Sequence, residues 1–158
     1  MDNGNGGGPI LLAYDGSEYA QASIREAARQ LSPGRDAVVF TVWTPLAALP
    51  FGTPGAGATD VDESLEAEAR KVADEGARLA ADAGFEATAL TASGSPVWQM
   101  IVDEADAQDA GVVVMGSHGR TGLGLLLLGS VAAAVARHTE RPVLIVHTNH
   151  HGSDISGS

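Results

Sequence analysis

Short apolar segments alternate with longer helix-like segments along almost the entire chain, and this alternation constrains the fold more than any other feature. The first apolar run, residues 10–14, is continuous rather than alternating in polarity, as expected of a strand that is covered on both faces. The predicted strands are residues 10–14, 37–43, 86–91, 111–115 and 142–147, and the predicted helices are residues 18–31, 62–82, 96–107 and 130–138. Right-handed crossovers then predict a three-layer α/β fold with a doubly wound, five-stranded parallel sheet in the order 3-2-1-4-5 and four helices.

Local residues predict where these elements begin and end. Ser17 is placed to cap the first helix, and Gly84 to end the second. Ser95 is predicted to cap the third helix, with Pro96 as its first residue. Residues 44–60 are rich in proline and glycine and predict an irregular loop, either a lid or a mobile segment.

The 158 residues are enough for one domain with a sizeable core. Residues 1–8 are rich in Gly and Asn, and residues 149–158 are polar, so we expect both ends to be flexible tails. The folded domain is predicted to span residues 9–148.

The balance of charge excludes several classes of partner. Nine Lys and Arg against twenty Asp and Glu give a formal net charge of −11. Because excess acid repels phosphate backbones and anionic lipid headgroups, we expect no nucleic-acid partner and no membrane partner. The absence of Cys excludes thiolate catalysis and Cys-ligated metal sites. Residues 1–8 lack the features of a signal peptide, and residues 121–136 form too short an apolar stretch to span a bilayer, so we expect a cytoplasmic protein.

A glycine-rich segment follows the fourth predicted strand and has the features of an anion site. Glycines let the backbone approach a ligand closely, and exposed N–H groups in such a loop can form a concavity that binds anions. Gly129-Ser130 then opens a helix whose N-terminal N–H groups favour phosphate, and Arg120 adds a cation. The segment therefore predicts a site for a di- or triphosphate at the carboxyl ends of the first and fourth strands, where the strand order reverses.

Two familiar phosphate loops do not match this segment. The chain contains no GxxxxGK[ST] sequence, and Gly122-Leu-Gly124 is followed three residues later by Leu127, where a dinucleotide fingerprint needs Gly or Ala. Neither a Walker-type ATPase nor a Rossmann dehydrogenase fits the sequence.

The spacing Gly116-x2-Gly119-x9-Gly129-Ser130 resembles the ATP-binding signature of the universal stress protein family. The chain is also similar to that family in Ala13-Tyr-Asp15-Gly-Ser17 and in its closing run 142–146, so the resemblance covers residues 9–148. One departure is the run Leu125–Leu128, which stands where the family usually has polar residues. These leucines would cover the sheet or form part of an interface.

The resemblance implies a stress-response protein that holds ATP, ADP or AMP as a regulatory ligand. It implies a homodimer formed through the last strand, Pro142–His147. It places Asp15 near the adenine or the phosphates and the backbone around Ala13 and Val42 along the adenine slot. The remaining residues of the implied nucleotide site, which would hold mainly the ribose and phosphates, are Met115, Gly116, Ser117, His118, Gly119, Arg120, Gly129, Ser130 and Val131.

Several of these residues have a purely structural alternative. Asp15 either contacts the nucleotide or its Mg²⁺, or is a turn residue before Gly16. In the same alternative, Gly116 and Gly119 are turn glycines and Arg120 is a solvated loop residue. Ser130 is a good helix cap whether or not phosphate is present. His118 is predicted to be a loop residue beside the ligand. Trp43 is either a core or rim aromatic or a residue that stacks on adenine. His147, His150 and His151 lack ordered partners for a metal site.

Three functions remain open from the sequence. The first is a nucleotide-binding regulatory protein, because a phosphate cradle is evident while a nucleophile with its base is not. The second is a slow ATP hydrolase or phosphotransferase in which Asp15 positions Mg²⁺ and Arg120 offsets charge on the γ-phosphate. The third is a nucleotide-independent dimer that docks a partner through Leu125–Leu128 or residues 44–60.

Overall fold

The computed structural model describes residues 7–50, 57–119 and 128–148. The flexible tails predicted at residues 1–8 and 149–158 lie outside this part of the chain, except for Gly7 and Gly8, and so do Arg120, Leu125–Leu127, His150 and His151. In chain order the elements are β1 (Ile10–Ala13), α1 (Glu18–Gln30), β2 (Asp36–Trp43), the short 3₁₀ helix η1 (Leu46–Ala48), α2 (Ala58–Asp82), β3 (Glu86–Ser93), α3 (Val97–Ala107), β4 (Val112–Gly116), α4 (Ser130–His138) and β5 (Val143–Val146).

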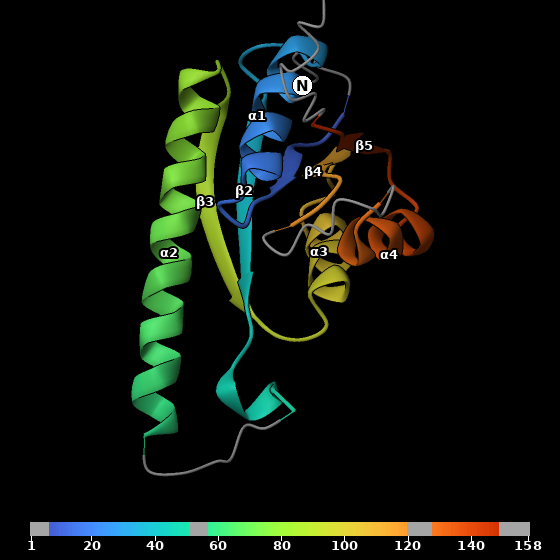
Figure 1. Cartoon of the computed structure of the whole chain (residues 1–158). Coiled ribbons are helices and arrows are strands. Elements are labelled where there is room, and N and C mark those ends of the chain that lie inside the picture. The colour runs from blue at the N-terminus through green and yellow to red at the C-terminus, as the bar shows by residue number, and fades with distance from the viewer. Residues whose placement is uncertain (1–6, 51–56, 120–127, 149–158) are drawn as a thin grey trace, which may run out of the picture.

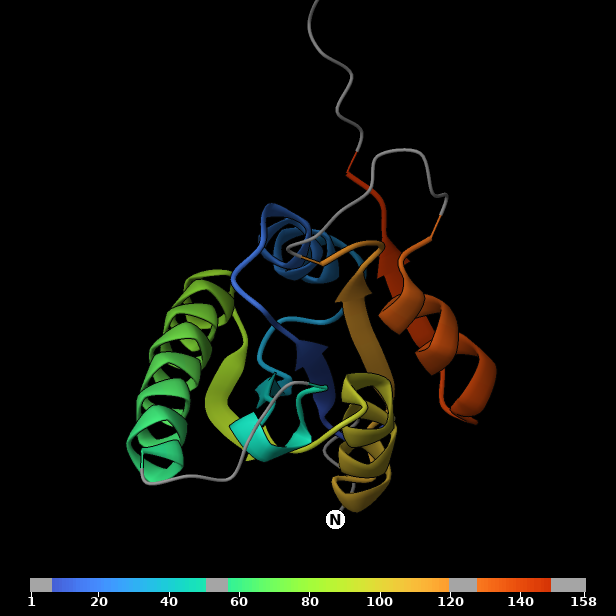
Figure 2. The same cartoon turned by 60° about the horizontal axis from the view of Figure 1, so that its bottom comes forward.

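The sheet confirms the predicted fold class and strand order. All strand pairs are parallel, and the order is β3-β2-β1-β4-β5. Figure 2 shows α1 and α2 on one side of the sheet and α3 and α4 on the other, which gives three layers. The two connections that leave β1 and β4 therefore run toward opposite edges of the sheet.

The position of β1 at the centre of the sheet explains why its sequence is continuously apolar. Ile10, Leu11 and Leu12 are all fully buried. Because side chains alternate along a strand, Ile10 and Leu12 belong to the core under α1 and α2, whereas Leu11 belongs to the core under α3 and α4. Each face of the sheet thus has its own apolar core.

Some predicted boundaries are confirmed by the cap geometry. The Ser17 hydroxyl accepts a hydrogen bond from the N–H of Ala20 (3.1 Å), which caps α1 as predicted. Gly84 follows α2 with a φ of +109°, a conformation that glycine adopts without strain.

Other predicted boundaries are wrong. Pro96 is the extended N-cap of α3, at φ −75° and ψ 156°, so Ser95 does not cap the helix and Pro96 is not its first residue. Gly129 is the N-cap of α4, so the cap predicted at Ser130 is also wrong, and Ser130 is the first helical residue. α2 begins at Ala58, and so extends four residues further than predicted into the segment predicted to be irregular. The helix is stabilised there by tertiary contact, because the N–H of Leu46 in η1 donates to the Asp62 carboxylate (2.9 Å).

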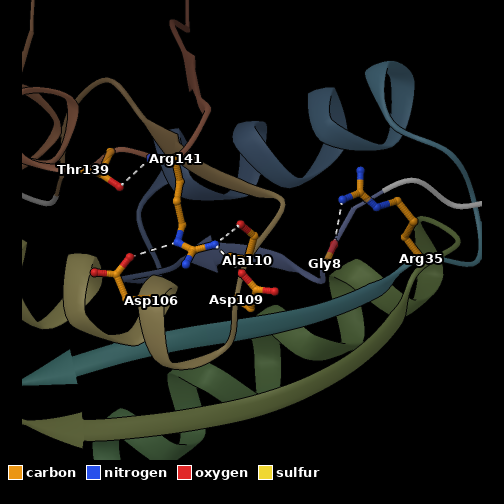
Figure 3. A network of polar contacts seen from close by, with 7 residues as sticks. All are labelled: Gly8, Arg35, Asp106, Asp109, Ala110, Thr139 and Arg141. Atoms are coloured by element: carbon orange, nitrogen blue, oxygen red, sulfur yellow. Dashed lines mark hydrogen bonds and ion pairs between the residues drawn. The ribbon is translucent and has the colours of Figure 1, made fainter. Parts of the chain in front are cut away.

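A polar network ties the end of α3 to the start of β5 (Figure 3). The Arg141 guanidinium donates to Asp106 Oδ1 (2.9 Å), to Asp109 Oδ1 (3.0 Å) and to the carbonyl of Ala110 (2.8 Å). Both carboxylates raise the pKa of Arg141 above its usual value. Near the middle of the sheet, Arg35 donates to the carbonyl of Gly8 (2.8 Å) and holds the chain just before β1. Among the helices in the described residues, none is long and apolar enough to cross a membrane.

Candidate functional site

A cavity of about 350 Å³ lies at the carboxyl ends of β1 and β4. These two strands are neighbours in the sheet, and their connections leave toward opposite edges. In parallel α/β sheets ligands bind in the crevice that such a reversal creates. The cavity therefore occupies the place in the fold where the sequence predicts the ligand.

The structure brings eleven of the twelve predicted nucleotide-site residues to the lining of this one cavity. They are Ala13, Asp15, Val42, Met115, Gly116, Ser117, His118, Gly119, Gly129, Ser130 and Val131. The twelfth, Arg120, lies outside the described residues. That these residues contact a nucleotide stays a prediction, but their convergence from four separate segments of the chain is a finding of the structure.

The turn after β1 is fixed by hydrogen bonds from both directions. The Tyr14 N–H donates to the carbonyl of Phe40 (2.9 Å), and the buried Thr41 hydroxyl donates to the carbonyl of Tyr14 (2.8 Å). Asp15 Oδ1 then accepts from the N–H of Ser17 (2.9 Å). Asp15 therefore stabilises the turn before α1 and also lines the cavity.

Close packing rather than turn conformation requires a glycine at position 116, whereas at position 119 a Cβ would meet the end of one side chain. A Cβ on Gly116 would lie 2.7 Å from Tyr19 Cβ, and one on Gly119 would lie 2.9 Å from Asp15 Oδ2. Neither glycine is among the described residues with positive φ. Gly116 therefore lets α1 approach β4, and Gly119 leaves room for the Asp15 carboxylate beside the loop after β4.

Hydrogen bonds also fix both ends of the glycine-rich segment. The Ser117 N–H continues the ladder to β5 by donating to the carbonyl of Val146 (2.9 Å). The N–H of Gly129 donates to the carbonyl of Ser117 (2.6 Å), so the chain returns to α4 beside the point where it left β4. A Cβ on Gly129 would lie 2.8 Å from that same carbonyl oxygen. Position 129 therefore needs glycine for this contact.

The N-terminus of α4 opens on the cavity. Gly129, Ser130 and Val131 all line it, and the first N–H groups of a helix have no partner within the helix. Together with the helix dipole, these groups favour an anion at this end of the cavity.

His118 lies between two other side chains at the cavity. Its Nδ1 is 3.0 Å from the hydroxyl oxygen of Ser117, whose side chain is buried. Its ring centroid is 5.3 Å from that of Tyr19 on α1. These contacts hold the imidazole at the lining, as the prediction of a loop residue beside the ligand requires.

The backbone of Val42 is placed by the register of the sheet. In a parallel ladder one residue directs both its N–H and its C=O toward the same neighbouring strand. Phe40 O accepts from Tyr14, so Phe40 faces β1, and Val42, two residues further along β2, faces the same side. Because β1 ends at Ala13, the polar backbone groups of Val42 lie beyond the end of that strand, next to the cavity.

An apolar wall completes the cavity, and sequence reasoning missed most of it. The missed lining residues are Tyr14, Ala20, Phe40, Val97, Ile101 and Ala132. Val97 and Ile101 are four residues apart on α3 and so share one face of the helix. The signal available in the sequence was their position just after the third strand, at the ligand-binding edge of the sheet. Trp43, at the end of β2, is half-buried and is not among the described lining residues.

The Tyr14 hydroxyl contacts α2. It donates to Glu75 Oε1 (3.2 Å), and burial together with this carboxylate raises the pKa of Tyr14 to about 12. The phenol is therefore neutral at physiological pH, and the ionisable side chains that the described lining presents to a ligand are Asp15 and His118. The described residues contain no group of three or more His, Cys, Asp or Glu side chains arranged to hold a metal ion.

Comparison with known proteins agrees with this architecture. The universal stress protein family matches residues 8–147. A universal stress protein of Methanocaldococcus jannaschii is 30% identical over 87% of this chain and 80% of its own length. Universal stress protein YxiE of Bacillus subtilis is 30% identical over 87% of this chain and 97% of its own length.

Two solved universal stress protein structures that resemble this fold contain nucleotides. One, in complex with cAMP, has a TM-score of 0.66 and 25% identity over 90% of this chain and 98% of its own. The other, from Archaeoglobus fulgidus in complex with dAMP, has a TM-score of 0.58 and 26% identity over 87% of this chain and 95% of its own.

Proposed function

Because the chain belongs to the universal stress protein family, we propose that it binds an adenine nucleotide, ATP, ADP or AMP, in the cavity between β1 and β4. The observation that carries this proposal is the convergence of eleven predicted site residues on one cavity. Relatives of the same fold bind cAMP and dAMP, which supports an adenine nucleotide as the ligand. In this proposal the nucleotide is a regulatory ligand of a cytoplasmic stress-response protein.

The base belongs in the apolar part of the cavity. Phe40, Val97, Ile101 and Met115 offer a surface that suits a flat aromatic ring. The polar backbone groups of Val42 at the end of β2 supply one donor and one acceptor for the polar edge of adenine.

The phosphates belong at the opposite, glycine-lined end. Gly119 and Gly129 carry no side chain that would keep a phosphate from the backbone N–H groups, and the N-terminus of α4 adds its dipole. Asp15 lies at this end, with Oδ2 close to Gly119. A carboxylate beside a phosphate chain is a common arrangement for Mg²⁺, which takes one or two carboxylates and completes its shell with phosphates and water. We therefore assign Mg²⁺ to Asp15 when a di- or triphosphate is bound.

A homodimer through residues 142–147 is part of the same proposal. β5 is an edge strand, and its Val143, Leu144 and Ile145 are only half-buried. An unpaired edge with apolar side chains is a surface on which a second copy can pair. Sedimentation equilibrium is expected to give twice the monomer mass, and a concentration-independent monomer would contradict this part.

Isothermal titration calorimetry of the full chain with ATP and AMP, each with and without Mg²⁺, tests the proposal. Saturable binding of either nucleotide is expected, with Mg²⁺ strengthening the binding of ATP more than that of AMP. Absence of heat at millimolar nucleotide, with the protein folded by circular dichroism, would contradict nucleotide binding.

Two substitutions at one position separate the roles of Asp15. Asp15→Asn keeps an oxygen that can accept from Ser17 but removes the charge, whereas Asp15→Ala removes both. If Asp15 holds Mg²⁺, Asn abolishes the Mg²⁺ dependence of ATP binding and leaves AMP binding close to normal. If Asp15 only shapes the turn, Asn is neutral and Ala alone weakens both nucleotides. Asp36→Asn, at the exposed start of β2, is the matched control.

A further inference from the structure

One wall of the cavity is made of apolar side chains from three elements. Phe40 and Val42 come from β2, Met115 from β4, and Val97 and Ile101 from α3. All five belong to the same apolar cluster on the α3–α4 face of the sheet. A ligand group that contacts this wall meets only methyl, methylene and ring carbons together with one thioether.

α3 holds its part of the wall rigidly. Ile101 is only 3% exposed, and Ala105, one turn further along the same face, is fully buried. The C-terminal end of the helix is tied to the start of β5 through Arg141 (Figure 3). The wall therefore cannot rearrange freely to give a polar ligand group a partner.

The polar groups of the described lining are grouped elsewhere. Asp15 follows β1, Ser117 and His118 follow β4, and Ser130 begins α4. The polar backbone of Val42 points from β2 toward the end of β1. A ligand whose polar edges face these groups can place its remaining edge against the part of the wall that α3 supplies.

We propose, on the basis of the nucleotide binding proposed above, that Val97 and Ile101 determine base specificity by excluding purines with an additional polar group on the edge that faces α3. Adenine carries only hydrogen at C2 and at C8. Guanine carries an amino group at C2, and against this wall that group would lose its water without gaining a hydrogen bond. Burying an unpaired polar group discriminates by about 10- to 100-fold, which is enough to distinguish two purines.

Two analogues that differ from AMP by a single amino group provide the test. We would titrate the full chain with AMP, 2-amino-AMP and 8-amino-AMP by calorimetry. At least one of the two analogues is expected to bind roughly tenfold or more weakly than AMP, and the weaker one identifies the edge that faces α3. Equal affinity for all three ligands would overturn the inference while leaving nucleotide binding intact. Absence of AMP binding would instead contradict the proposed function and this inference together.

Val97→Thr and Ile101→Thr place a hydroxyl in the wall and provide the second test. Val97 is half-buried at the start of α3, so its variant is expected to fold even if the substitution at Ile101 does not. In a folded variant the disfavoured analogue is expected to bind more tightly than it binds the unmodified protein, which a general loss of structure would not produce. Val102→Thr, on the same helix but away from the described cavity lining, is the control and should leave the ratio unchanged. An unchanged ratio in Val97→Thr would overturn the assignment to α3.

Discussion

The sheet has a long side, formed by the strands β2 and β3, and a short side, formed by β1, β4 and β5, and the two sides end at different heights where the cavity lies. β2 and β3 have eight residues each and pair along their full length, and the 25-residue helix α2 runs beside them (Figure 1). β1, β4 and β5 have only four, five and four residues. β1 pairs with β2 as far as Phe40 and stops, whereas β2 continues to Trp43.

This difference in length creates the cavity. Beyond the ends of β1 and β4, the neighbouring β2 and α3 form a wall of the cavity. Apart from Met115 of β4, the apolar surface comes from β2 and α3, whereas the carboxylate, the imidazole and the N-terminus of α4 follow the short strands β1 and β4. We therefore expect changes on the short side to alter ligand binding and stability together, and changes at the far end of the long side to alter neither strongly.

Gly116→Ala should have the largest effect, because it acts on the short side where two elements meet. The new Cβ would lie 2.7 Å from Tyr19 Cβ and 2.8 Å from the Tyr19 backbone carbon, so α1 must move away from β4. Overpacking of this kind costs about 1–3 kcal/mol of unfolding free energy, and we expect nucleotide binding to be lost with it. Urea unfolding and calorimetry measure the two effects separately. An unchanged stability would show that the approach of α1 to β4 is not needed.

The two sides were also unequally predictable from sequence. The alternation of apolar runs correctly predicts the strand order. Each buried strand needs helices on both faces of the sheet, and the connections between parallel strands are right-handed. Motif spacing led to the polar, short-strand side, because the glycines at 116, 119 and 129 match the spacing of a nucleotide-binding signature.

The apolar wall was not predictable in the same way. Val97 and Ile101 look like any core residues of an amphipathic helix, and only the end of β1 at Ala13 leaves them beside a cavity. The last residues of β3 were missed because Ala92 and Ser93 have weak strand propensity, and it is pairing with Val42 and Trp43 that makes them extended. The cap at Ser130 was wrong because Ser is a good N-cap in general, whereas here the contact of Gly129 with Ser117 moves the cap back by one residue.

Thr41→Val should have the next largest effect, because Thr41 joins the long side to the turn of the short side. Its hydroxyl donates to the carbonyl of Tyr14, directly before Asp15. Removing the donor leaves a buried acceptor without this partner, which costs about 1–3 kcal/mol of unfolding free energy and loosens the Asp15 turn. The same substitution at Thr91, its register partner on β3, is the control. If both variants lose equal stability and keep nucleotide affinity, the bond to Tyr14 does not position the site.

Tyr14→Phe tests the contact between α2 and the strand that ends at the site. It removes the hydrogen bond to Glu75 (3.2 Å), for which we expect a loss of about 1 kcal/mol. Folding raises the pKa of Tyr14 from 10.0 to about 12, so the neutral phenol is the form that the fold stabilises. This contribution is fully present below pH 10 and is lost as the pH rises toward 12. Denaturant titrations across this range should show a steeper fall for the unmodified chain than for Tyr14→Phe, and parallel curves would contradict the assignment.

Asp62→Ala should have the smallest effect, and it tests the independence of the long side most directly. Asp62, near the N-terminal end of α2, accepts from the N–H of Leu46 in η1. The contact is partly exposed, so the expected loss of unfolding free energy is about 0.5 kcal/mol or less. Asp60→Ala, in the first turn of the same helix, controls for the loss of a negative charge near the helix N-terminus. We expect the nucleotide affinity measured by calorimetry to be the same in both variants as in the unmodified chain. A weakening confined to Asp62→Ala would mean that the segment at η1 contributes to the ligand site, and the division between a binding side and a supporting side would then fail at that point.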